Sequence, residues 1–484
     1  NMIQFIRSFC NYCNLIYKIH NYYNYYYIHK KHNNDMIRNI TNSITDCGSV
    51  AIKFSQWVTP KLELMYLERN SKGESRPEWI DLLEDYYENC PIHCINYTNS
   101  IYRTEFNEDL NDIYENIQII GSGSIAQVYK AHNKKENRED VLKIVHPNVE
   151  NEIKFFRKFI SILLALPCVK RIYNRCFPFD IYGFIDQFME QIDLIKETNH
   201  NLYFYKKYRD NPFIIIPEIY KISKNVLIMS YEEGLSFNDN DLTEYHKDKL
   251  ANIFHLFIKT NLMFSNYNHG DMHPGNWKIR IDNEDNINKI IIYDFGFCWS
   301  MPDDKFNQIG DSFQEIFENS NDKSKESSIE SFSNILEYVI LSNGVDYKEK
   351  INIFVSNRID TIEPWKISPI KLFQCTVDFC IQESVLINPI LIQCIIILIQ
   401  GEKLFEEYNL MSSDDNIISD YEVFRDRYLN ILTFCETYSI FDEFKEYIIL
   451  KLNELQIDVG NIFDTIDISM ITEKLIPPID TNNT

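Results

Sequence analysis

The sequence predicts an α+β fold of two lobes flanked by helical extensions. The chain has 484 residues, more than one hydrophobic core usually organises, and its 45% content of hydrophobic residues is ample to bury. Two β-type runs around a pair of glycines, followed by a lysine-bearing strand over 141–145, place a sheet in the first half of the chain. Apolar runs over 155–167 and 390–399 indicate packed helices, because both are shorter than the ~20 residues of a membrane span.

Gly121 and Gly123 separate the first two β-type runs and predict the tip of a hairpin. A tip without Cβ atoms can lay its backbone amides over phosphate groups, so the segment 119–131 predicts a nucleotide-covering loop. The next strand carries Lys143 in an otherwise apolar run, which is where kinases keep the lysine that contacts the α- and β-phosphates. Taken singly, the glycines also fit an ordinary turn and Lys143 a solubilised strand edge, but their order favours a nucleotide site.

The most informative motif runs from His269 to Asn276 and reads His-Gly-Asp-Met-His-Pro-Gly-Asn. A second aspartate, Asp294, follows the apolar run 289–293 and precedes Phe-Gly. Phosphoryl transfer requires little covalent chemistry, so a protein mainly positions the nucleophile and holds Mg²⁺ against the nucleotide phosphates. In kinases an Asp and an Asn four residues apart share the catalytic loop, and the Asp of Asp-Phe-Gly is the main metal ligand. The motif therefore predicts phosphoryl transfer.

Together these segments resemble the UbiB/ADCK atypical kinase-like family. The most distinctive part is Ser-Ile-Ala-Gln-Val (124–128), which ordinary protein kinases do not carry. The resemblance covers roughly residues 45 to 410 and rests on the segments 121–131, 142–147, 191–199 and 269–276. It implies a bilobal protein-kinase-like fold with an N-terminal helical extension bearing a Lys-x-Gly-Gln motif, for which Lys53-Phe-Ser-Gln56 is the match here.

Two departures from the family pattern concern the nucleotide loop and the extension. Many members have an alanine-rich loop, whereas this chain has Gly121 and Gly123, which favours a more ordinary ATP pose. Ser55 stands where the extension motif has glycine, and it adds a side chain to a helix expected to lie over the site. Lys53 and Gln56 of that motif are retained.

A third departure is Gln191, which stands where many members place the glutamate of a Glu-x-Asp motif. In kinases that glutamate pairs with the strand lysine, and a neutral amide cannot supply the same charge interaction with Lys143. Either Asp193 or Glu197 takes over, or Lys143 is less firmly held. We favour a partial substitution by Glu197, which lies one helical turn after Asp193.

The resemblance implies a role for each site residue. Asp271 would orient the acceptor or accept its proton, and Asn276 and Asp294 would hold Mg²⁺. Lys143 would contact the α/β-phosphates of ATP. Further nucleotide contacts are expected from Ile120, Gly121, Gly123, Ser124 and Val128 of the loop, and from Met229. The strand that carries Met229 is either the hinge that receives adenine or simply a core strand.

The implied activity is that of an ATPase or small-molecule kinase that supports isoprenoid-quinone metabolism. One alternative is a small-molecule phosphotransferase like the aminoglycoside and choline kinases, which share the His-Gly-Asp loop but lack the Ser-Ile-Ala-Gln-Val segment. The other is a catalytically weak scaffold in which ATP binding switches a lipid- or protein-binding surface. Retention of Asp271, Asn276 and Asp294 favours the enzyme.

Charge and cysteine usage limit the partners and the compartment. A net charge of −23 argues against a nucleic-acid-binding surface, which needs clustered Lys and Arg. The twelve scattered cysteines lack the dense spacing of a secreted disulfide scaffold, so we expect a reducing, intracellular compartment. Cys90, His93 and Cys94 imitate a zinc site, but nothing else in the sequence supports a metal there.

Residues 1 to 34 contain no Asp or Glu, and they contain four Lys or Arg and seven tyrosines. This composition suits a transit peptide or an interfacial anchor, and a flexible or loosely helical flank is the simpler expectation. Mitochondrial or membrane-peripheral placement follows only by family analogy. We expect these segments: a basic Tyr/Asn-rich flank (1–44), a helical extension (45–110), an N-lobe (111–235) with a helical insertion (150–182), a C-lobe (236–410) and a C-terminal helical extension (411–484).

Overall fold

The computed structural model describes most of the chain up to Tyr408. The described residues are 2–69, 80, 82–83, 90–236, 242, 244–282, 287–318, 325–358, 369–408, 432, 435, 440–442, 445–446 and 448–449. The expected C-terminal helical extension over 411–484 therefore lies almost entirely outside the described residues.

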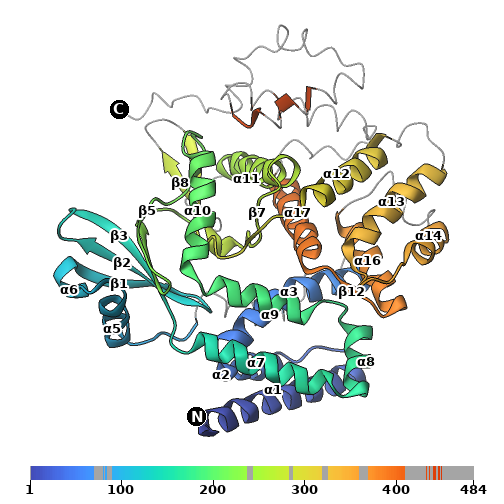
Figure 1. Ribbon diagram of the computed structural model, residues 1–484, viewed down its shortest axis with the longest axis horizontal. Coiled ribbons are helices and arrows are strands. Elements are labelled where there is room, and N and C mark those ends of the chain that lie inside the picture. The colour runs from blue at the N-terminus through green and yellow to red at the C-terminus, as the bar shows by residue number, and fades with distance from the viewer. Residues whose placement is uncertain are drawn as a thin grey trace.

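The N-lobe is built on a five-stranded antiparallel sheet in the order β1-β2-β3-β6-β5. Its strands are β1 (Tyr114–Ser122), β2 (Ala126–Asn133), β3 (Arg138–Val145), β5 (Ile219–Ile222) and β6 (Val226–Ser230). One face packs against α5 (Ile95–Phe106) and α6 (Leu110–Ile113), with Leu142, Tyr129 and Tyr102 in the shared core. The sheet and these helices form one side of the molecule (Figure 1).

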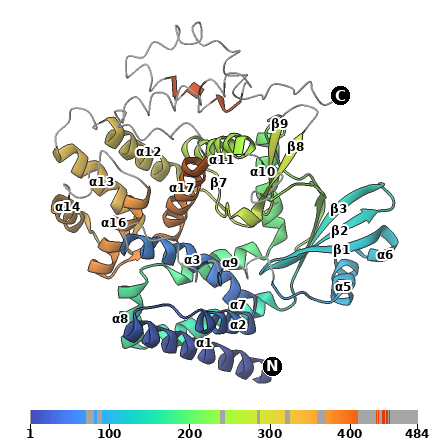
Figure 2. The ribbon, with the colours of Figure 1, turned by 180° about the vertical axis from the view of Figure 1, so that it is seen from behind.

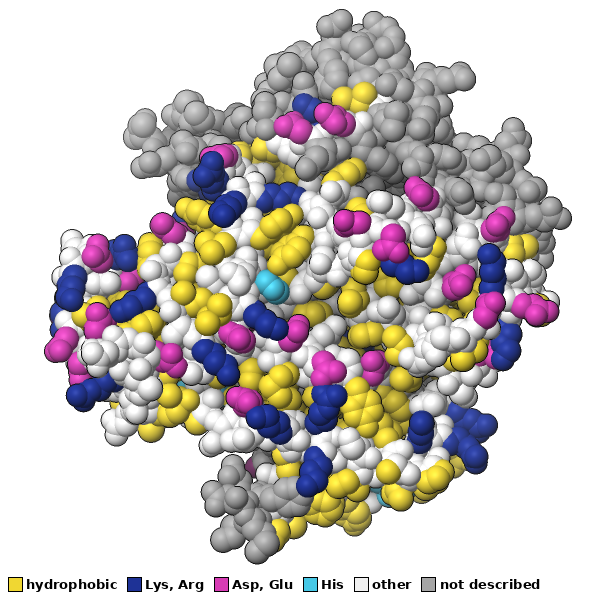
Figure 3. Space-filling model, in the orientation of Figure 1, with side chains coloured by type: hydrophobic (Ala, Val, Ile, Leu, Met, Phe, Trp, Pro, Cys, Tyr) yellow, Lys and Arg dark blue, Asp and Glu magenta, His cyan; other side chains and the backbone are white. Residues whose placement is uncertain are grey.

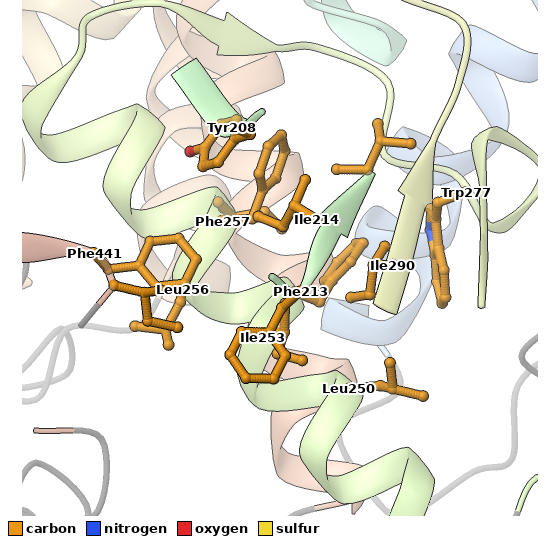
Figure 4. Close-up of a cluster of buried hydrophobic side chains, with 14 of the residues drawn as sticks. Tyr208, Phe213, Ile214, Leu250, Ile253, Leu256, Phe257, Trp277, Ile290 and Phe441 are labelled. Atoms are coloured by element: carbon orange, nitrogen blue, oxygen red, sulfur yellow. The ribbon is translucent and has the colours of Figure 1, made fainter. Parts of the chain in front are cut away.

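The C-lobe is largely helical and centres on α11 (Glu244–Phe264) and α17 (Pro389–Tyr408). Figure 4 shows Ile253 and Phe257 of α11 packed with Phe213, Ile290 and other buried side chains. The remaining helices are α12 (Asp303–Glu318), α13 (Lys325–Val339), α14 (Lys348–Ser356) and α16 (Pro369–Glu383). Together the two lobes give the α+β, bilobal, protein-kinase-like fold that the sequence predicts.

Short strands of the C-lobe carry the polar motif. β8 (Trp277–Asp282) and β9 (Ile287–Ile292) form a three-stranded sheet with β4 (Ile214–Ile215), and β7 (Asn268–His269) pairs with β10 (Cys298–Trp299). The 3₁₀ turn η1 (Pro274–Asn276) joins them. A further small pair consists of β11 (Ile340–Leu341) and β12 (Leu386–Ile387).

The N-terminal region, for which composition predicts a flexible or loosely helical flank, is a layer of helices. It comprises α1 (Met2–His29), α2 (Asn34–Cys47) and α3 (Ser49–Arg69), where Tyr12 of α1 lies among Phe155, Phe156 and Phe159. The aromatic positions of α1 repeat at helical spacing, so packing overrides the polar appearance of the segment. Figure 2 shows α1 and α2 along the edge of the molecule that carries α7 and α8, with α3 leading inward from that edge beside α9.

The helical insertion is longer than predicted. It consists of α7 (Val149–Leu164), α8 (Pro167–Cys176) and α9 (Ile181–Gln191), and is followed by α10 (Leu194–Tyr208). The apolar side of α7, which includes Ile153 and Phe156, is buried against α3 and α9 in one cluster. The run 155–167 thus lies in the packed helix α7 up to Leu164 and then turns into α8. None of the described helices is long and apolar enough to cross a membrane.

Candidate active site

Lys143 lies at the centre of the site. It projects from β3, whose neighbouring side chains are apolar and buried, and its own side chain is 8% exposed. The ammonium Nζ donates to Oε1 and Oε2 of Glu197 at 2.7 and 2.9 Å and to Oδ1 of Asp294 at 3.0 Å. Two carboxylates from different lobes therefore hold one lysine.

The charges in this group depend on one another. Burial alone would lower the pKa of Lys143, but Asp294 and Glu197 outweigh it and raise the pKa, so the ammonium stays protonated. Burial would raise the pKa of Asp294, but Lys143 and Lys53 lower it to about 2. For Glu197, burial is the larger effect and raises the pKa to about 7, against the opposing charge of Lys143.

Local structure explains why Glu197, and not the other two expected partners, reaches Lys143. Asp193 is the N-cap of α10 and accepts from the backbone N–H of Ile195, so its carboxylate is engaged there. Gln191 is the last residue of α9 and is buried. Glu197 lies in the first turn of α10, 3% exposed, and faces the sheet. The structure thus places the residue that we favoured at the lysine.

Asp294 is delivered by β9 and held in an uncommon backbone conformation. Its φ is +44°, in the left-handed region that residues other than glycine adopt at some cost in free energy. Its Oδ1 also accepts from the backbone N–H of Gly296 at 3.2 Å. Phe295 behind it is 1% exposed and contacts the rings of Phe204 and His269, which fixes the backbone on either side.

The catalytic-loop residues Asp271 and Asn276 are joined directly. The side-chain Nδ2 of Asn276 donates to the backbone carbonyl of Asp271 at 2.8 Å, so its Oδ1 is the atom that can bind a cation. His269 is buried, and burial lowers its pKa. Its Nδ1 accepts from the N–H of Asp271 and its Nε2 contacts the carbonyl of Tyr293. A neutral His269 therefore links the loop to the end of β9.

The N-terminal extension reaches the same site. Lys53 of α3 donates to Oδ2 of Asp271 at 3.3 Å, across 218 positions of sequence. Gln56, one turn later, accepts from the hydroxyl of Ser124 in the glycine loop at 3.5 Å. Ser55 lies between them and is only partly buried, so this replacement of glycine is accommodated. The extension thus connects the catalytic loop to the nucleotide loop.

The predicted nucleotide loop is the tip of the β1–β2 hairpin. Gly121 pairs with Val128 in the register, and the amide of Gly123 donates to the carbonyl of Ala126 at 3.0 Å. A Cβ atom added at Gly121 meets no atom within 4 Å, and one at Gly123 comes no closer than 3.8 Å. The glycines therefore leave open space above the loop. Ile120 is 49% exposed, whereas Ser124 is buried.

Met229 lies on β6, beside β3, and is 7% exposed. Tyr231 follows it on the chain that leads from this sheet to β8, where Leu235 pairs with Ile279. The chain thus runs from the sheet of the N-lobe to β8 of the C-lobe at this point.

Lys61 is a site-adjacent residue that the sequence reasoning missed. It is 1% exposed, donates to the carbonyl of Trp57 at 2.8 Å and lies 4.1 Å from the centre of the Trp57 ring. Burial lowers its pKa to about 7, and the charge of Asp271 opposes this. The sequence carried one indication of this position: Lys53, Trp57 and Lys61 are spaced four residues apart, so they share one face of a helix.

These residues fit ATP and Mg²⁺. Asp294 uses only Oδ1 for its contacts with described residues, so Oδ2 is available, and Asn276 offers a carbonyl oxygen. Mg²⁺ prefers oxygen ligands and takes one or two protein carboxylates together with substrate phosphates and water. Within the described residues no cluster of three or more His, Cys, Asp or Glu side chains is arranged to hold a metal. Both ring nitrogens of His93 contact protein groups, Nδ1 that of His146 and Nε2 the hydroxyl of Thr98.

Comparison with known sequences identifies a family of kinase-like domains. The model of the ABC1 atypical kinase-like domain matches residues 86–328, which is about half of the chain. A probable serine/threonine-protein kinase, abkC, of Dictyostelium discoideum is 29% identical over 260 residues, covering 52% of this chain and 36% of that protein. A probable protein kinase UbiB of Cronobacter sakazakii is 24% identical over 205 residues, covering 41% of this chain and 37% of that protein. The chain thus spans little more than a third of each relative.

The solved structures that match the chain have lower sequence identity. A Mycobacterium tuberculosis protein, Rv3197, in complex with erythromycin has a TM-score of 0.41 at 17% identity, covering 66% of this chain and 85% of that one. An ethanolamine kinase of Plasmodium vivax has a TM-score of 0.26 at 14% identity, covering 70% and 95%. From the family match over 86–328 and the lobes that carry its motifs, the chain belongs to the ABC1 atypical kinase-like family.

Proposed function

We propose that this protein transfers the γ-phosphoryl group of ATP, in a Mg²⁺-dependent reaction, to a small-molecule or lipid acceptor or to water. The observation that carries the proposal is the convergence of Lys143, Glu197 and Asp294 within 3.0 Å contacts, next to Asp271 and Asn276. A buried lysine between two carboxylates is costly to assemble unless its charge is used. The link to isoprenoid-quinone metabolism rests on the family resemblance alone.

Each side chain has a defined task in this proposal. Lys143, kept cationic by its two partners, binds the α/β-phosphate oxygens. Asp294 and Asn276 present oxygen atoms, and Mg²⁺ bound there would neutralise charge on the β- and γ-phosphates. Asp271 orients the acceptor hydroxyl or water and takes its proton. The glycine loop covers the phosphates with its amides.

The extension regulates this site. Lys53 contacts Oδ2 of Asp271, the carboxylate that would accept the proton. Turnover therefore requires Lys53 to move or to pair with the nucleotide instead. This contact also supports the scaffold alternative, in which ATP binds but is not hydrolysed.

ATP turnover with Mg²⁺, compared between the wild type and Asp294→Asn, tests the proposal. Turnover that disappears in the variant supports a phosphoryl-transfer site. If the wild type binds ATP but hydrolyses none under any condition, including with lipid vesicles, the scaffold alternative is favoured over the enzyme. A screen of amino-alcohol and aminoglycoside acceptors tests the third possibility, a small-molecule phosphotransferase. Only such an enzyme would form one phosphorylated acceptor for each ATP consumed.

We also propose contact with an anionic lipid surface. The outward side of α1 is apolar and aromatic with no acidic residue, and its exposed large side chains are Ile6, Phe9, Ile16, Tyr17, Ile19, Tyr23, Tyr27 and Ile28. The adjoining helix α8 exposes Lys170, Arg171, Ile172 and Arg175, and the segment 153–179 has no Asp or Glu. Figure 3 shows dark blue side chains gathered over α8 beside yellow ones over α1.

Such a face suits a lipid interface, because aromatic and aliphatic side chains enter the headgroup region while cations bind anionic lipids. The net charge of the whole chain is −23, so the excess of cations on this face is opposite in sign to the charge of the chain as a whole. The exposed thiols of Cys10, Cys13, Cys168 and Cys176 on these helices support a reducing compartment.

A further inference from the structure

Gln127, in the Ser-Ile-Ala-Gln-Val segment, has no task in the proposed chemistry although it lies directly after the nucleotide loop. Its side chain is fully buried, at 0% exposure. The amide Nε2 donates to the hydroxyl of Tyr129 at 2.7 Å, and Oε1 accepts from the backbone N–H of His93 at 2.7 Å. Both ends of the amide are engaged, so its orientation is fixed.

A chain of hydrogen bonds continues from Tyr129 to the loop. The Tyr129 and Thr98 hydroxyls are 2.7 Å apart, and Thr98 Oγ1 lies 3.0 Å from Nε2 of His93. The Nδ1 atoms of His93 and His146 are 2.8 Å apart, and Nε2 of His146 lies 3.0 Å from the carbonyl oxygen of Gly123. The chain therefore starts at Gln127 and ends on the backbone of the glycine loop.

The direction of every bond in this chain follows from its two ends. A carbonyl only accepts, so Nε2 of His146 carries a hydrogen, and in the neutral ring its Nδ1 is an acceptor. Nδ1 of His93 must then donate, and its Nε2 must accept from Thr98. Thr98 in turn accepts from Tyr129, whose oxygen accepts from the Gln127 amide. All groups are satisfied in this single arrangement, with both imidazoles neutral.

We propose that His93 is a positioning residue for the nucleotide loop, which it holds through His146 by this one-directional relay from Gln127 to the Gly123 carbonyl. The inference rests on the proposed ATP-binding function of that loop. It gives the Ser-Ile-Ala-Gln-Val segment a physical task, because Gln127 sets the direction of the relay. It also explains the Cys90–Cys94 segment, whose first residue donates its backbone N–H to the Ser122 carbonyl at 3.0 Å.

An additional proton does not fit into the relay. Both unprotonated ring nitrogens, Nε2 of His93 and Nδ1 of His146, already accept a hydrogen bond. A hydrogen on Nε2 of His93 would force Thr98 to turn and donate to Tyr129. The Tyr129 hydroxyl would then hold a hydrogen with no acceptor among the described residues. Burial lowers the pKa of His93 to about 4 and also lowers that of His146, in agreement. Among the described titratable side chains, Tyr97 and Tyr129 have ring contacts with His93.

The first test is ¹⁵N NMR of histidine-labelled, nucleotide-free protein at neutral pH. The relay requires the Nδ1–H tautomer at His93, which is the less common form of free histidine, and the Nε2–H tautomer at His146. Assignment uses the loss of each signal in the His93→Asn and His146→Gln variants. The opposite tautomer at either ring, or a protonated ring at pH 7, overturns the proposal.

The second test compares two substitutions of His93 by amide exchange of 121–126 and by MgATP affinity. Asn can keep the donor at the position of Nδ1, whereas Leu cannot. We expect His93→Leu to speed exchange of the loop amides and to weaken MgATP binding about tenfold, and His93→Asn to retain most of both. His132→Leu is the control, because His132 is partly exposed on β2 and bonds Glu139 outside the relay.

The two readouts separate this inference from the proposed function. The hydrogen exchange of the loop amides and the tautomers of the two histidines are both measured without nucleotide. These measurements therefore test the relay even if the wild type does not bind ATP. If His93→Asn and His93→Leu behave alike, or if neither changes loop exchange, His93 does not position the loop. A changed affinity in His132→Leu would also count against it, since the effect would then be unspecific.

Discussion

At the residue scale, the site depends on a lysine that is buried between two acids. A lone ammonium in this position would be strongly destabilised, and each of the two carboxylates offsets part of that cost. Glu197 and Asp294 come from different lobes, so the ion pairs of Lys143 connect the lobes as well as preparing the site.

Replacing Glu197 by Gln removes the fully buried carboxylate and leaves Lys143 with Asp294 only. We expect a loss of ~3 kcal/mol in the free energy of unfolding and at least a tenfold loss in MgATP affinity, because breaking a buried pair is costly. Urea unfolding and nucleotide titration measure the two. The control is Glu190→Gln, whose side chain is 67% exposed and bonds Lys196. Equal effects in both variants would mean that Glu197 does not hold the lysine.

Gly121 offers a substitution that separates binding from folding. A Cβ at this position meets nothing within 4 Å in the protein, and the residue does not have a positive φ. We therefore expect Gly121→Ala to leave the melting temperature unchanged while weakening MgATP binding, because the proposed function puts the nucleotide phosphates in the space that the added methyl would enter. Thermal melting with and without nucleotide checks both. A variant that melts lower without nucleotide would show that the glycine is structural.

At the element scale, α3 carries Lys53 and Gln56 into the site and is anchored by α7. The carboxylate of Glu152 accepts from the backbone N–H of Ser49 at 3.0 Å and from that of Val50, which caps the first turn of α3. Gly48 before it has a φ of +96°, and a Cβ there would lie 2.8 Å from Oε2 of Glu152. Only glycine fits this junction.

Burial raises the pKa of Glu152 to about 7, although the two backbone donors oppose it. The folded state then binds this proton more tightly than the unfolded chain does, so its contribution to stability falls as pH rises from about 4.5 to 7, by ~3 kcal/mol at most. We expect Glu152→Gln to remove this fall. Urea midpoints at pH 5 and pH 8 measure it, with exposed Glu150→Gln as control. An unchanged pH dependence in Glu152→Gln would contradict the assignment.

At the scale of the whole molecule, the chain is acidic, but the face formed by α1 and α8 is apolar and positively charged. The cations of α8 and the apolar side of α1 lie at one edge, away from the N-lobe sheet (Figures 1 and 3). A surface of this kind associates with membranes only when charge and apolar area act together.

Charge reversal at Lys170, Arg171 and Arg175 tests the lipid contact. We expect at least about tenfold weaker binding to vesicles that contain anionic lipid, and no difference on neutral vesicles, since each cation near such a surface contributes ~1 kcal/mol. The control reverses the exposed residues Lys134, Lys135 and Lys278, which change the net charge equally on other elements. Vesicle co-sedimentation measures both. If both triple variants lose binding equally, net charge and not this face is responsible.

Much of the architecture followed from local patterns. The glycine hairpin, the lysine strand and the Asp-x₄-Asn loop with its following Asp-Phe-Gly each have a short-range chemical reason, so their order predicted the lobes and the site. The helices of the insertion followed from apolar spacing. For the N-terminal flank, composition left a flexible and a loosely helical segment open, and the structure shows helices whose Tyr12 packs against Phe155, Phe156 and Phe159 of α7.

The sequence alone determined the family, the two-lobe fold and the polar groups available for phosphoryl transfer, because these depend on residue types at short spacings. Tertiary structure decided which groups meet. Glu197 reaches Lys143 from 54 positions away, Lys53 reaches Asp271 from 218, and His93 reaches His146 from 53. Contacts over such separations depend on how helices and sheet pack, and side-chain type does not specify that packing.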